Sequence, residues 1–427
     1  MTDIKNNMTA NKMYERSISL PRGTLDLTYQ TNFSGDSKNY ELEDLLGFAQ
    51  RINPKRAFLF VSKVLGRHIP VAPGTMRHAF TDLANLVPDD LPKPILVIGM
   101  AETAVGLSAG VHQALQTRYP NALLLNSTRH AQHNDDNTET LLTTFSEDHS
   151  HASQHLIYQS ADTVTQAQLL ASKTLIMVDD EASTGNTCVN VVTSLRNAGL
   201  DQLQQVHLTT LVDWSLNQNQ SHANADDTIA TRLSNIEFHR HHLLSGAWQW
   251  TDAPNPEPIT MPSVDTTEAG SYALGDTGNW GRFPTLDSTD GFAFYLTKFQ
   301  AAFNLFNQQA QSEKASFEKE QLPQRILVLG SNEFVWLPFL LAEWLETQTQ
   351  NATVKFSALT RSPIALGGAI TTMLSFNDNY GLGMTNFAYN VEPSDWDLIV
   401  LCVETSADSV DEMWKDLDNV LVVSPTL

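Results

Sequence analysis

The chain has 427 residues, of which 41% are hydrophobic and 17% charged, and 48 Asp and Glu against 26 Lys and Arg give a net charge of −22. This composition indicates a globular protein of two or three domains, and the acidic charge argues against a basic surface for nucleic acid or anionic lipid. No stretch approaches the ~18 apolar residues of a membrane span, and the polar N-terminus lacks a signal-peptide core. Cys188 and Cys402 lie in apolar segments and are expected to be reduced, so we expect a cytoplasmic protein.

The first part of the chain alternates short apolar strands with amphipathic helices. Residues 1–20 are polar, and we expect a flexible N-terminal tail there. The patterns that follow predict strands at 23–29, 94–99, 122–125, 173–178 and 205–212, and helices at 42–51, 103–119 and 188–198. Such alternation is typical of a mostly parallel sheet flanked by helices, so we predict an α/β domain over residues 21–250.

Residues 251–290 break this alternation. Prolines between 254 and 262 are followed by glycines between 270 and 281, and this density predicts a linker. Beyond it we predict an aromatic-rich helix at 291–309, a strand at 325–330, a helix at 334–346 and strands at 354–359 and 398–403. The sequence therefore predicts a second, smaller α/β domain at 291–427.

The most informative segment is residues 175–187. Four apolar residues predict a buried strand, Asp179 and Asp180 follow at its end, and a loop of small residues opens the next helix. Backbone N–H groups at a helix start attract phosphate, and paired carboxylates can accept hydrogen bonds from the vicinal hydroxyls of a ribose. The segment therefore predicts a site for a phosphorylated sugar, with an ordinary acidic turn as the alternative.

This segment resembles the 5-phosphoribosyl-1-pyrophosphate (PRPP) motif of type I phosphoribosyltransferases. Asp179 and Asp180 match the acidic pair of the motif, and its phosphate loop is matched by Ser183, Thr184, Gly185, Asn186 and Thr187. Glu181 departs from the motif, because many members carry an apolar residue there and a carboxylate adds negative charge near an anionic ligand. The resemblance implies that the acidic pair binds the ribose hydroxyls and takes part in catalysis, while the loop binds the 5-phosphate.

In this family an earlier strand–turn–helix binds the pyrophosphate of PRPP. The segment that fits this place consists of Gly99, Met100, Ala101, Glu102 and Thr103. The amides after the glycine would face the pyrophosphate at a helix start, and an ordinary strand–helix turn is the alternative. Cations must offset the charge of the leaving group, and the candidates are Lys55, Arg56, Lys63, Arg67 and Arg129. Of these we expect Arg129 and Lys63 to supply the charge. The resemblance also implies Mg²⁺ bound with PRPP and no metal ligand supplied directly by the protein.

The resemblance further implies a mobile lid, which we place at about residues 127–155. It would contain His149, His151 and His155, which could bind the acceptor or act as general acid or base near neutral pH. A metal site and incidental loop histidines are the alternatives. A similar cluster at 239–242, which contains Arg240, is given less weight.

The C-terminal part carries the tetrapeptide Thr360-Arg361-Ser362-Pro363 directly after a predicted strand. Arg361 could grip an anion through two hydrogen bonds, with the Ser362 hydroxyl beside it, and a strand-ending turn is the alternative. This tetrapeptide is that of the TRSP domain, which lies C-terminal to an orotate-phosphoribosyltransferase-like domain in proteins of bacterial tellurite-resistance and stress gene clusters. The chain resembles that family over most of its length.

The resemblance implies an enzyme in which a base-like acceptor displaces pyrophosphate from C1 of PRPP, in making a nucleoside-like metabolite linked to stress or tellurite resistance. It also implies a homodimer and protein partners from the same gene cluster, whereas no nucleic-acid or membrane partner is expected. Two other interpretations stay open. One is a non-catalytic protein that senses PRPP or a nucleotide, and the other is a bifunctional protein whose C-terminal domain processes the nucleotide product.

Overall fold

The computed structural model describes residues 12–31, 40–51, 56–131, 140–146, 154–216, 229–233, 235–256, 258–263, 277–310, 323–349 and 351–426. Its largest sheet has seven strands in the order β1-β2-β11-β10-β9-β5-β6. These are β1 (Met13–Leu20), β2 (Gly23–Thr31), β5 (Ile95–Gly99), β6 (Leu123–Asn126), β9 (Thr174–Ala182), β10 (Gln205–Asp213) and β11 (Glu237–Asp252). The strands from β11 to β6 are parallel, and β1 and β2 form an antiparallel hairpin at one edge. The predicted α/β fold is confirmed.

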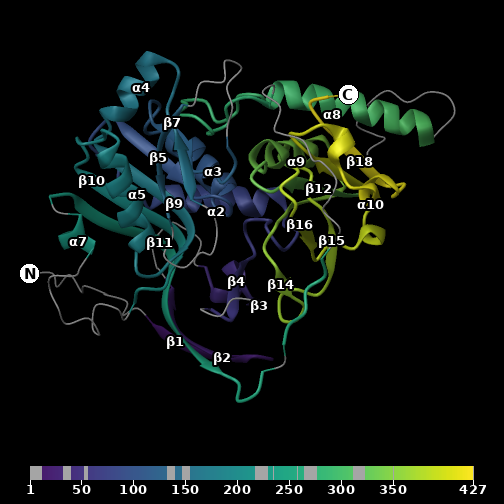
Figure 1. Cartoon of the computed structure of the whole chain (residues 1–427), viewed down its shortest axis with the longest axis horizontal. Coiled ribbons are helices and arrows are strands. Elements are labelled where there is room, and N and C mark those ends of the chain that lie inside the picture. The colour runs from purple at the N-terminus through teal and green to yellow at the C-terminus, as the bar shows by residue number, and fades with distance from the viewer. Residues whose placement is uncertain are drawn as a thin grey trace, which may run out of the picture.

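Helices cover both faces of this sheet. They are α2 (Pro73–Asn85), α3 (Val105–Leu115), α4 (Thr163–Leu170), α5 (Asn186–Asn197) and the short α7 (Ile229–Arg232). The chain passes from β5 through α3 to β6, but from β9 through α5 to β10, which lies in the other direction along the sheet (Figure 1). Because such crossovers are right-handed, α3 and α5 lie on opposite faces. The direction of winding therefore reverses between β5 and β9, the place where open α/β sheets bind ligands.

The structure corrects two sequence predictions near the N-terminus. Residues 13–20 were expected to be part of a flexible tail, but they form β1, which pairs with β2 along its whole length. The helix predicted at 42–51 ends early: α1 (Leu42–Leu45) is followed directly by β3 (Leu46–Arg51), which pairs with β4 (Phe58–Ser62). In both places, pairing with a neighbouring strand decides the local structure.

The C-terminal half contains a four-stranded parallel sheet in the order β13-β12-β17-β18. Its elements are α8 (Phe292–Ala310), β12 (Arg325–Ser331), α9 (Trp336–Gln348), β13 (Thr353–Leu359), β17 (Leu398–Cys402), α10 (Glu412–Lys415) and β18 (Val420–Val423), with a hairpin of β15 (Met373–Asn377) and β16 (Thr385–Tyr389). In Figure 1 this half lies beside the large sheet, with α8 along its outer side.

The two halves share one hydrophobic core. α9 packs against α2 and α3, and the ring of Phe80 meets that of Phe339 edge-on, with 5.4 Å between the ring centres. A small third sheet also crosses the boundary, because β14 (Ile364–Ala365) pairs with β3. The described part of the predicted linker is packed as well: Trp280 is buried, and Thr285 forms a β-bridge with Leu124. No helix of the described residues is both long and apolar enough to cross a membrane.

Candidate functional site

The acidic pair and the small-residue loop lie where the winding of the large sheet reverses. Leu175 to Val178 are buried in β9, which continues through Asp179 and Asp180 to Ala182 because β10 pairs beside it. Gly185 then adopts a φ of 78° and directly precedes α5. A Cβ atom at this position would lie 2.4 Å from Cδ1 of Ile229. The left-handed backbone therefore favours glycine at the turn, and a Cβ atom would also displace the end of the Ile229 side chain.

Arg240 fixes the backbone of this loop. Its Nη2 donates to the carbonyl oxygens of Ser183 and Thr184, at 3.3 and 3.4 Å. Its Nη1 is 3.0 Å from both carboxylate oxygens of Asp213, at the end of the neighbouring β10. Because Arg240 holds the carbonyl oxygens of Ser183 and Thr184, the backbone conformation of the loop is fixed without a ligand. Arg240 was given little weight in the sequence analysis, although a cation directly after a histidine in a polar strand could have been noted.

Glu181, the departure from the motif, is neutralised by a residue distant in sequence. Its carboxylate forms a two-point ion pair with Arg56, at 2.7 and 3.2 Å, and accepts a hydrogen bond from Nε1 of Trp214 at 3.1 Å. Burial raises the pKa of Asp180 to about 6, and the Glu181 carboxylate adds to this rise. The acidic pair therefore contains one carboxyl that titrates close to neutral pH.

The Gly99 turn follows β5, directly beside the acidic pair, since Gly99 lies opposite Val178 of β9. A Cβ atom at Gly99 would lie 2.1 Å from Oγ of Ser108, so α3 requires glycine here. The amide of Met100 donates to the Val178 carbonyl at 3.3 Å, and that of Ala101 to Oγ of Ser127 at 3.0 Å. Two of the four amides expected to face a pyrophosphate thus donate within the protein. Those of Glu102 and Thr103 remain candidates for this role.

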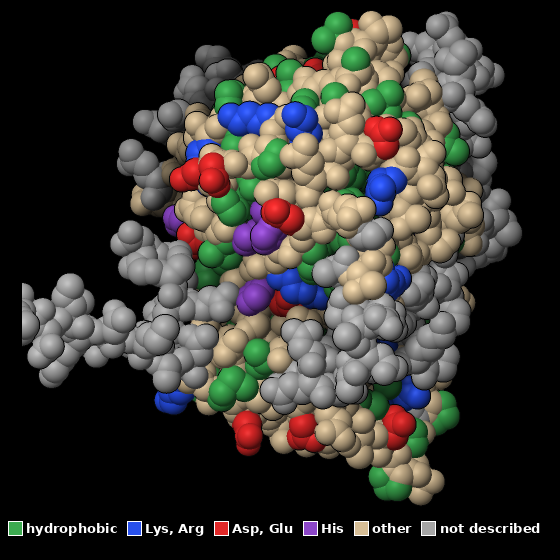
Figure 2. Space-filling model, turned by 90° about the vertical axis from the view of Figure 1, so that its left-hand side faces the viewer, with side chains coloured by type: hydrophobic (Ala, Val, Ile, Leu, Met, Phe, Trp, Pro, Cys, Tyr) green, Lys and Arg blue, Asp and Glu red, His purple; other side chains and the backbone are tan. Residues whose placement is uncertain are grey.

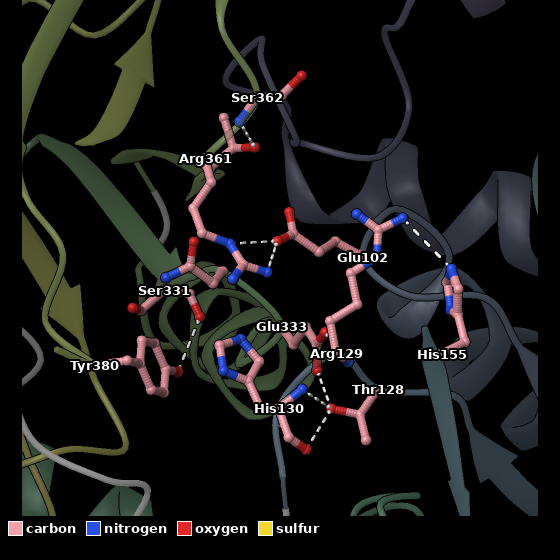
Figure 3. A network of polar contacts seen from close by, with 12 residues as sticks. Glu102, Thr128, Arg129, His130, His155, Ser331, Glu333, Arg361, Ser362 and Tyr380 are labelled. Carbon is pink, nitrogen blue, oxygen red and sulfur yellow. Dashed lines mark hydrogen bonds and ion pairs between the residues drawn. The ribbon is translucent and has the colours of Figure 1, made fainter. Parts of the chain in front are cut away.

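The side chain of Glu102 joins the turn to the C-terminal half. One carboxylate oxygen pairs with Arg67, and the other accepts from Nε and Nη2 of Arg361 at 3.0 and 2.5 Å. Burial alone would raise the pKa of Glu102, but the two arginines outweigh burial and lower this pKa to about 2. Figure 3 shows Arg361 pointing toward Glu102 from one side, while Arg129 rises on the other. Arg361, expected to grip an external anion, therefore grips a carboxylate of the protein itself.

Arg129 lies near this turn, close enough to affect the Glu102 carboxylate, and its role beside a pyrophosphate stays a prediction. Its amide donates to Oε1 of Glu333 at 2.8 Å, and its Nη2 is 3.4 Å from Nε2 of His155. Lys63 lies elsewhere, in the residue after β4, where its Nζ donates to the carbonyl of Glu43 at 2.9 Å. The role of Lys63 stays a prediction that no observed contact supports.

Of the three lid histidines assigned a predicted role, His155 lies within the described residues, and His149 and His151 lie outside them. It is buried in β8 (His155–Tyr158), which pairs with β7 (Leu141–Phe145), and its ring stacks on Phe145. Its Nδ1 lies 3.0 Å from Oγ of Ser127. His155 therefore contacts Arg129 and Ser127, in the segment after β6, and packs inside the protein.

Internal contacts also hold two other predicted clusters, the tetrapeptide at 360–363 and the histidine-rich segment at 239–242. The Ser362 amide donates to Oγ1 of Thr360, and the Ser362 carbonyl accepts from the Tyr389 hydroxyl. These two hydrogen bonds fix the tetrapeptide as a turn. On β10 and β11 the rings of His207 and His241 stack with centres 5.1 Å apart, and burial lowers the pKa of the two to about 3 and 4. Figure 2 shows histidines on this side of the molecule among acidic and basic side chains.

The described residues hold no group of three or more His, Cys, Asp or Glu side chains suited to a metal ion. Asp179 and Asp180 were expected to bind the ribose hydroxyls and not the metal, but they carry hard oxygen atoms of the kind that binds Mg²⁺ when phosphates complete its coordination. The residues present therefore fit a metal that arrives with a phosphorylated ligand.

Comparison with known proteins gives two family matches. Residues 45–246 match a model described as phosphoribosyl transferase, and residues 298–420 match one described as the TRSP domain C-terminal to it. No curated protein matches the chain.

Solved structures to which the chain is similar include three phosphoribosyltransferases. Adenine phosphoribosyl transferase from Trypanosoma brucei is 13% identical with a TM-score of 0.33, and the match covers 54% of this chain and 86% of that one. Orotate phosphoribosyltransferase from Aeropyrum pernix is 16% identical (TM-score 0.25; 44% and 78% covered). A hypoxanthine phosphoribosyltransferase from Staphylococcus aureus is 13% identical (TM-score 0.22; 42% and 77% covered). The two family matches alone indicate a domain of the phosphoribosyl transferase type at residues 45–246, followed by a domain of the TRSP type at residues 298–420.

Proposed function

We propose that the protein is a phosphoribosyltransferase that binds Mg²⁺–PRPP and transfers the phosphoribosyl group to a base-like acceptor. The observation that carries this proposal is the joint position of two segments. The acidic pair lies near the end of β9 and its glycine loop follows that strand, while the Gly99 turn follows β5. These two strands are neighbours at the reversal of winding. One ligand with a phosphate, a ribose and a second charged group can reach both segments.

In this reaction the bond from C1 of the ribose to the pyrophosphate oxygen breaks, and a bond from C1 to a nitrogen of the acceptor forms. Pyrophosphate leaves, and the acceptor nitrogen loses its proton to water or a base. Asp179 and Asp180 accept hydrogen bonds from the ribose hydroxyls, and residues 183–187 hold the 5-phosphate. Arg129 is the candidate cation beside the leaving group. Bound Mg²⁺ would neutralise charge on the pyrophosphate.

The test is titration calorimetry with PRPP in the presence of Mg²⁺, followed by a pyrophosphate-release assay with a panel of purine, pyrimidine and other nitrogen heterocycles. We expect wild-type protein to bind PRPP and Asp179→Asn/Asp180→Asn protein to bind it much more weakly. Arg325→Ala, which changes an exposed ion pair with Asp397 in the other domain, is the control. Unchanged PRPP binding by the double Asn variant would contradict the proposal.

A sensor that binds PRPP or a nucleotide without chemistry is the second candidate. It is favoured by the turn amides of Met100 and Ala101, which already donate within the protein. Binding without pyrophosphate release, for every base offered, would support the sensor and exclude the enzyme. The third interpretation, a C-terminal domain that processes the product, is weakened because Arg361 is paired with Glu102.

The link to stress or tellurite resistance belongs to the same proposal and rests on the resemblance alone. Growth of a deletion strain on tellurite, with and without the Asp179→Asn/Asp180→Asn gene, tests it. Equal growth of all strains would remove this part of the proposal.

A further inference from the structure

We propose that the TRSP domain is an integral part of the transferase site, in which Arg361 and Glu333 position the two segments that would meet the pyrophosphate. Both side chains belong to the C-terminal half, and each follows a strand of its sheet: Glu333 comes after β12 and Arg361 after β13. Arg361 contacts the Gly99 turn, which follows β5, and Glu333 contacts the segment that follows β6. This inference rests on the proposed function, because it assigns a role within the PRPP site.

Arg361 acts on the Gly99 turn through Glu102. The Glu102 side chain is 9% exposed and that of Arg361 is 12% exposed, so their two hydrogen bonds are shielded from water. Arg67 forms an ion pair with the second carboxylate oxygen of Glu102. A side chain held at both oxygens fixes its own backbone, and the Glu102 amide is one of the two in the turn left to meet a ligand. Arg361 therefore sets the direction of that amide from outside the transferase domain.

Glu333 acts on the segment after β6. Oε2 of Glu333 accepts from the Thr128 hydroxyl at 2.5 Å, and Oε1 accepts from the Arg129 amide at 2.8 Å. Glu333 is 5% exposed, so this contact is also buried. It fixes the backbone from which the Arg129 guanidinium extends, as Figure 3 shows.

The two held segments also contact each other. Arg129 reaches Nε2 of His155, His155 reaches Oγ of Ser127, and that oxygen accepts from the Ala101 amide of the turn. If Nδ1 of His155 carries the ring proton, it donates to Ser127, and Nε2 is left to accept from Arg129. The Gly99 turn and Arg129 are thus linked by hydrogen bonds into one unit. The C-terminal half holds this unit at two points, through Arg361 at Glu102 and through Glu333 at Thr128.

The 5-phosphate loop lies outside this unit. Arg240 and Asp213, both from the large sheet, hold its backbone. The proposal therefore predicts a split: loss of Arg361 should weaken binding of the pyrophosphate group and leave binding of ribose 5-phosphate unchanged. A general loss of structure would weaken both.

The experiment is calorimetric titration of full-length protein with inorganic pyrophosphate and Mg²⁺, with ribose 5-phosphate, and with PRPP. Arg361→Ala should weaken pyrophosphate and PRPP binding by about ten- to a hundredfold, the range found when a supporting residue lets a site relax. Arg361→Lys keeps the buried charge but cannot place two N–H groups in the same fork, so we expect a smaller loss in a protein that folds. Glu333→Gln should weaken pyrophosphate binding as well, and Arg325→Ala should bind all three ligands like wild type.

Two results would overturn the inference. One is Arg361→Ala and Arg361→Lys protein that binds pyrophosphate as tightly as wild type. The other is an equal loss of ribose 5-phosphate and pyrophosphate binding in the Lys variant, which would indicate a purely structural role. A wild-type protein that binds no PRPP would instead refute the proposed function.

Discussion

The buried carboxylate of Glu102 should make the stability of the protein depend on pH in the acid range. Its pKa of about 2 lies below the ordinary 4.5, because Arg67 and Arg361 favour the charged form. Each unit between the folded and unfolded pKa values is worth about 1.4 kcal/mol, so ionised Glu102 contributes about 3 kcal/mol to the free energy of unfolding above the unfolded pKa. This contribution disappears as the pH falls from about 4.5 through 2.

Comparison of wild type with Glu102→Gln isolates this contribution. Unfolding by urea, followed by tryptophan fluorescence between about pH 6 and pH 3, gives the free energy of unfolding of both proteins. Glu102→Gln cannot ionise at this position and leaves two buried guanidinium groups without their carboxylate, so it should be the less stable protein at pH 6. Over this range the difference should shrink by about 2 kcal/mol, since most of the titration lies above pH 3.

Glu343 offers a matched control at the same boundary between the halves. It pairs with Arg77 through two hydrogen bonds, but the two side chains are 24% and 26% exposed. Because partial exposure to solvent weakens an ion pair, Glu343→Gln should lower the free energy of unfolding less than Glu102→Gln does. If the stability difference between wild type and Glu102→Gln stays constant from pH 6 to pH 3, the buried pair does not act as described.

Three further predictions concern the loop and the acidic pair. Gly185→Ala should lower the free energy of unfolding by about 1 kcal/mol or more and abolish ribose 5-phosphate binding, because Gly185 has a positive φ. Thermal unfolding and calorimetry check this prediction. The control is Gly106→Ala, a helical position of α3 without a crowded neighbour, which should not lower stability. Arg240→Ala should weaken ribose 5-phosphate binding by about tenfold, measured by calorimetry, and wild-type affinity in the variant would exclude a role in shaping the loop. PRPP affinity should rise between pH 5 and pH 7 as Asp180 loses its proton near pH 6, and in Glu181→Gln the midpoint should move to lower pH; a midpoint that stays in place would remove Glu181 as a cause.

The sequence predicted those parts of the fold in which local pattern and tertiary environment agree. The apolar run before Asp179 is a buried strand, and Gly185 forms the turn before α5. The prediction failed for β3, where residues that suit a helix are paired with β4 and β14. It also failed for β1, although the alternation of Ile18 and Leu20 with Ser17 and Ser19 was a usable signal in the sequence.

The polar cluster around Glu102 could not be predicted, because it joins residues that are far apart in the sequence. Glu102 and Arg361 are separated by 259 positions, and Arg56 and Glu181 by 125. No spacing rule relates such residues. Glu181 departed from its motif without an evident reason because its partner Arg56 could not be identified from the sequence. Arg361 was expected to bind an external anion because its partner Glu102 could not be identified either.

The strand β14 has a consequence for the independence of the two halves. This short segment of the C-terminal half completes a sheet whose other strands, β3 and β4, come from the N-terminal half. A protein made as two separate chains, divided between β11 and Trp280, should therefore reassociate through strand pairing, the common core and the buried Glu102 pairs. Either piece alone would carry an open strand edge and a bare apolar helix face. The boundary between the two family matches therefore does not divide the described residues into two parts with separate hydrophobic cores.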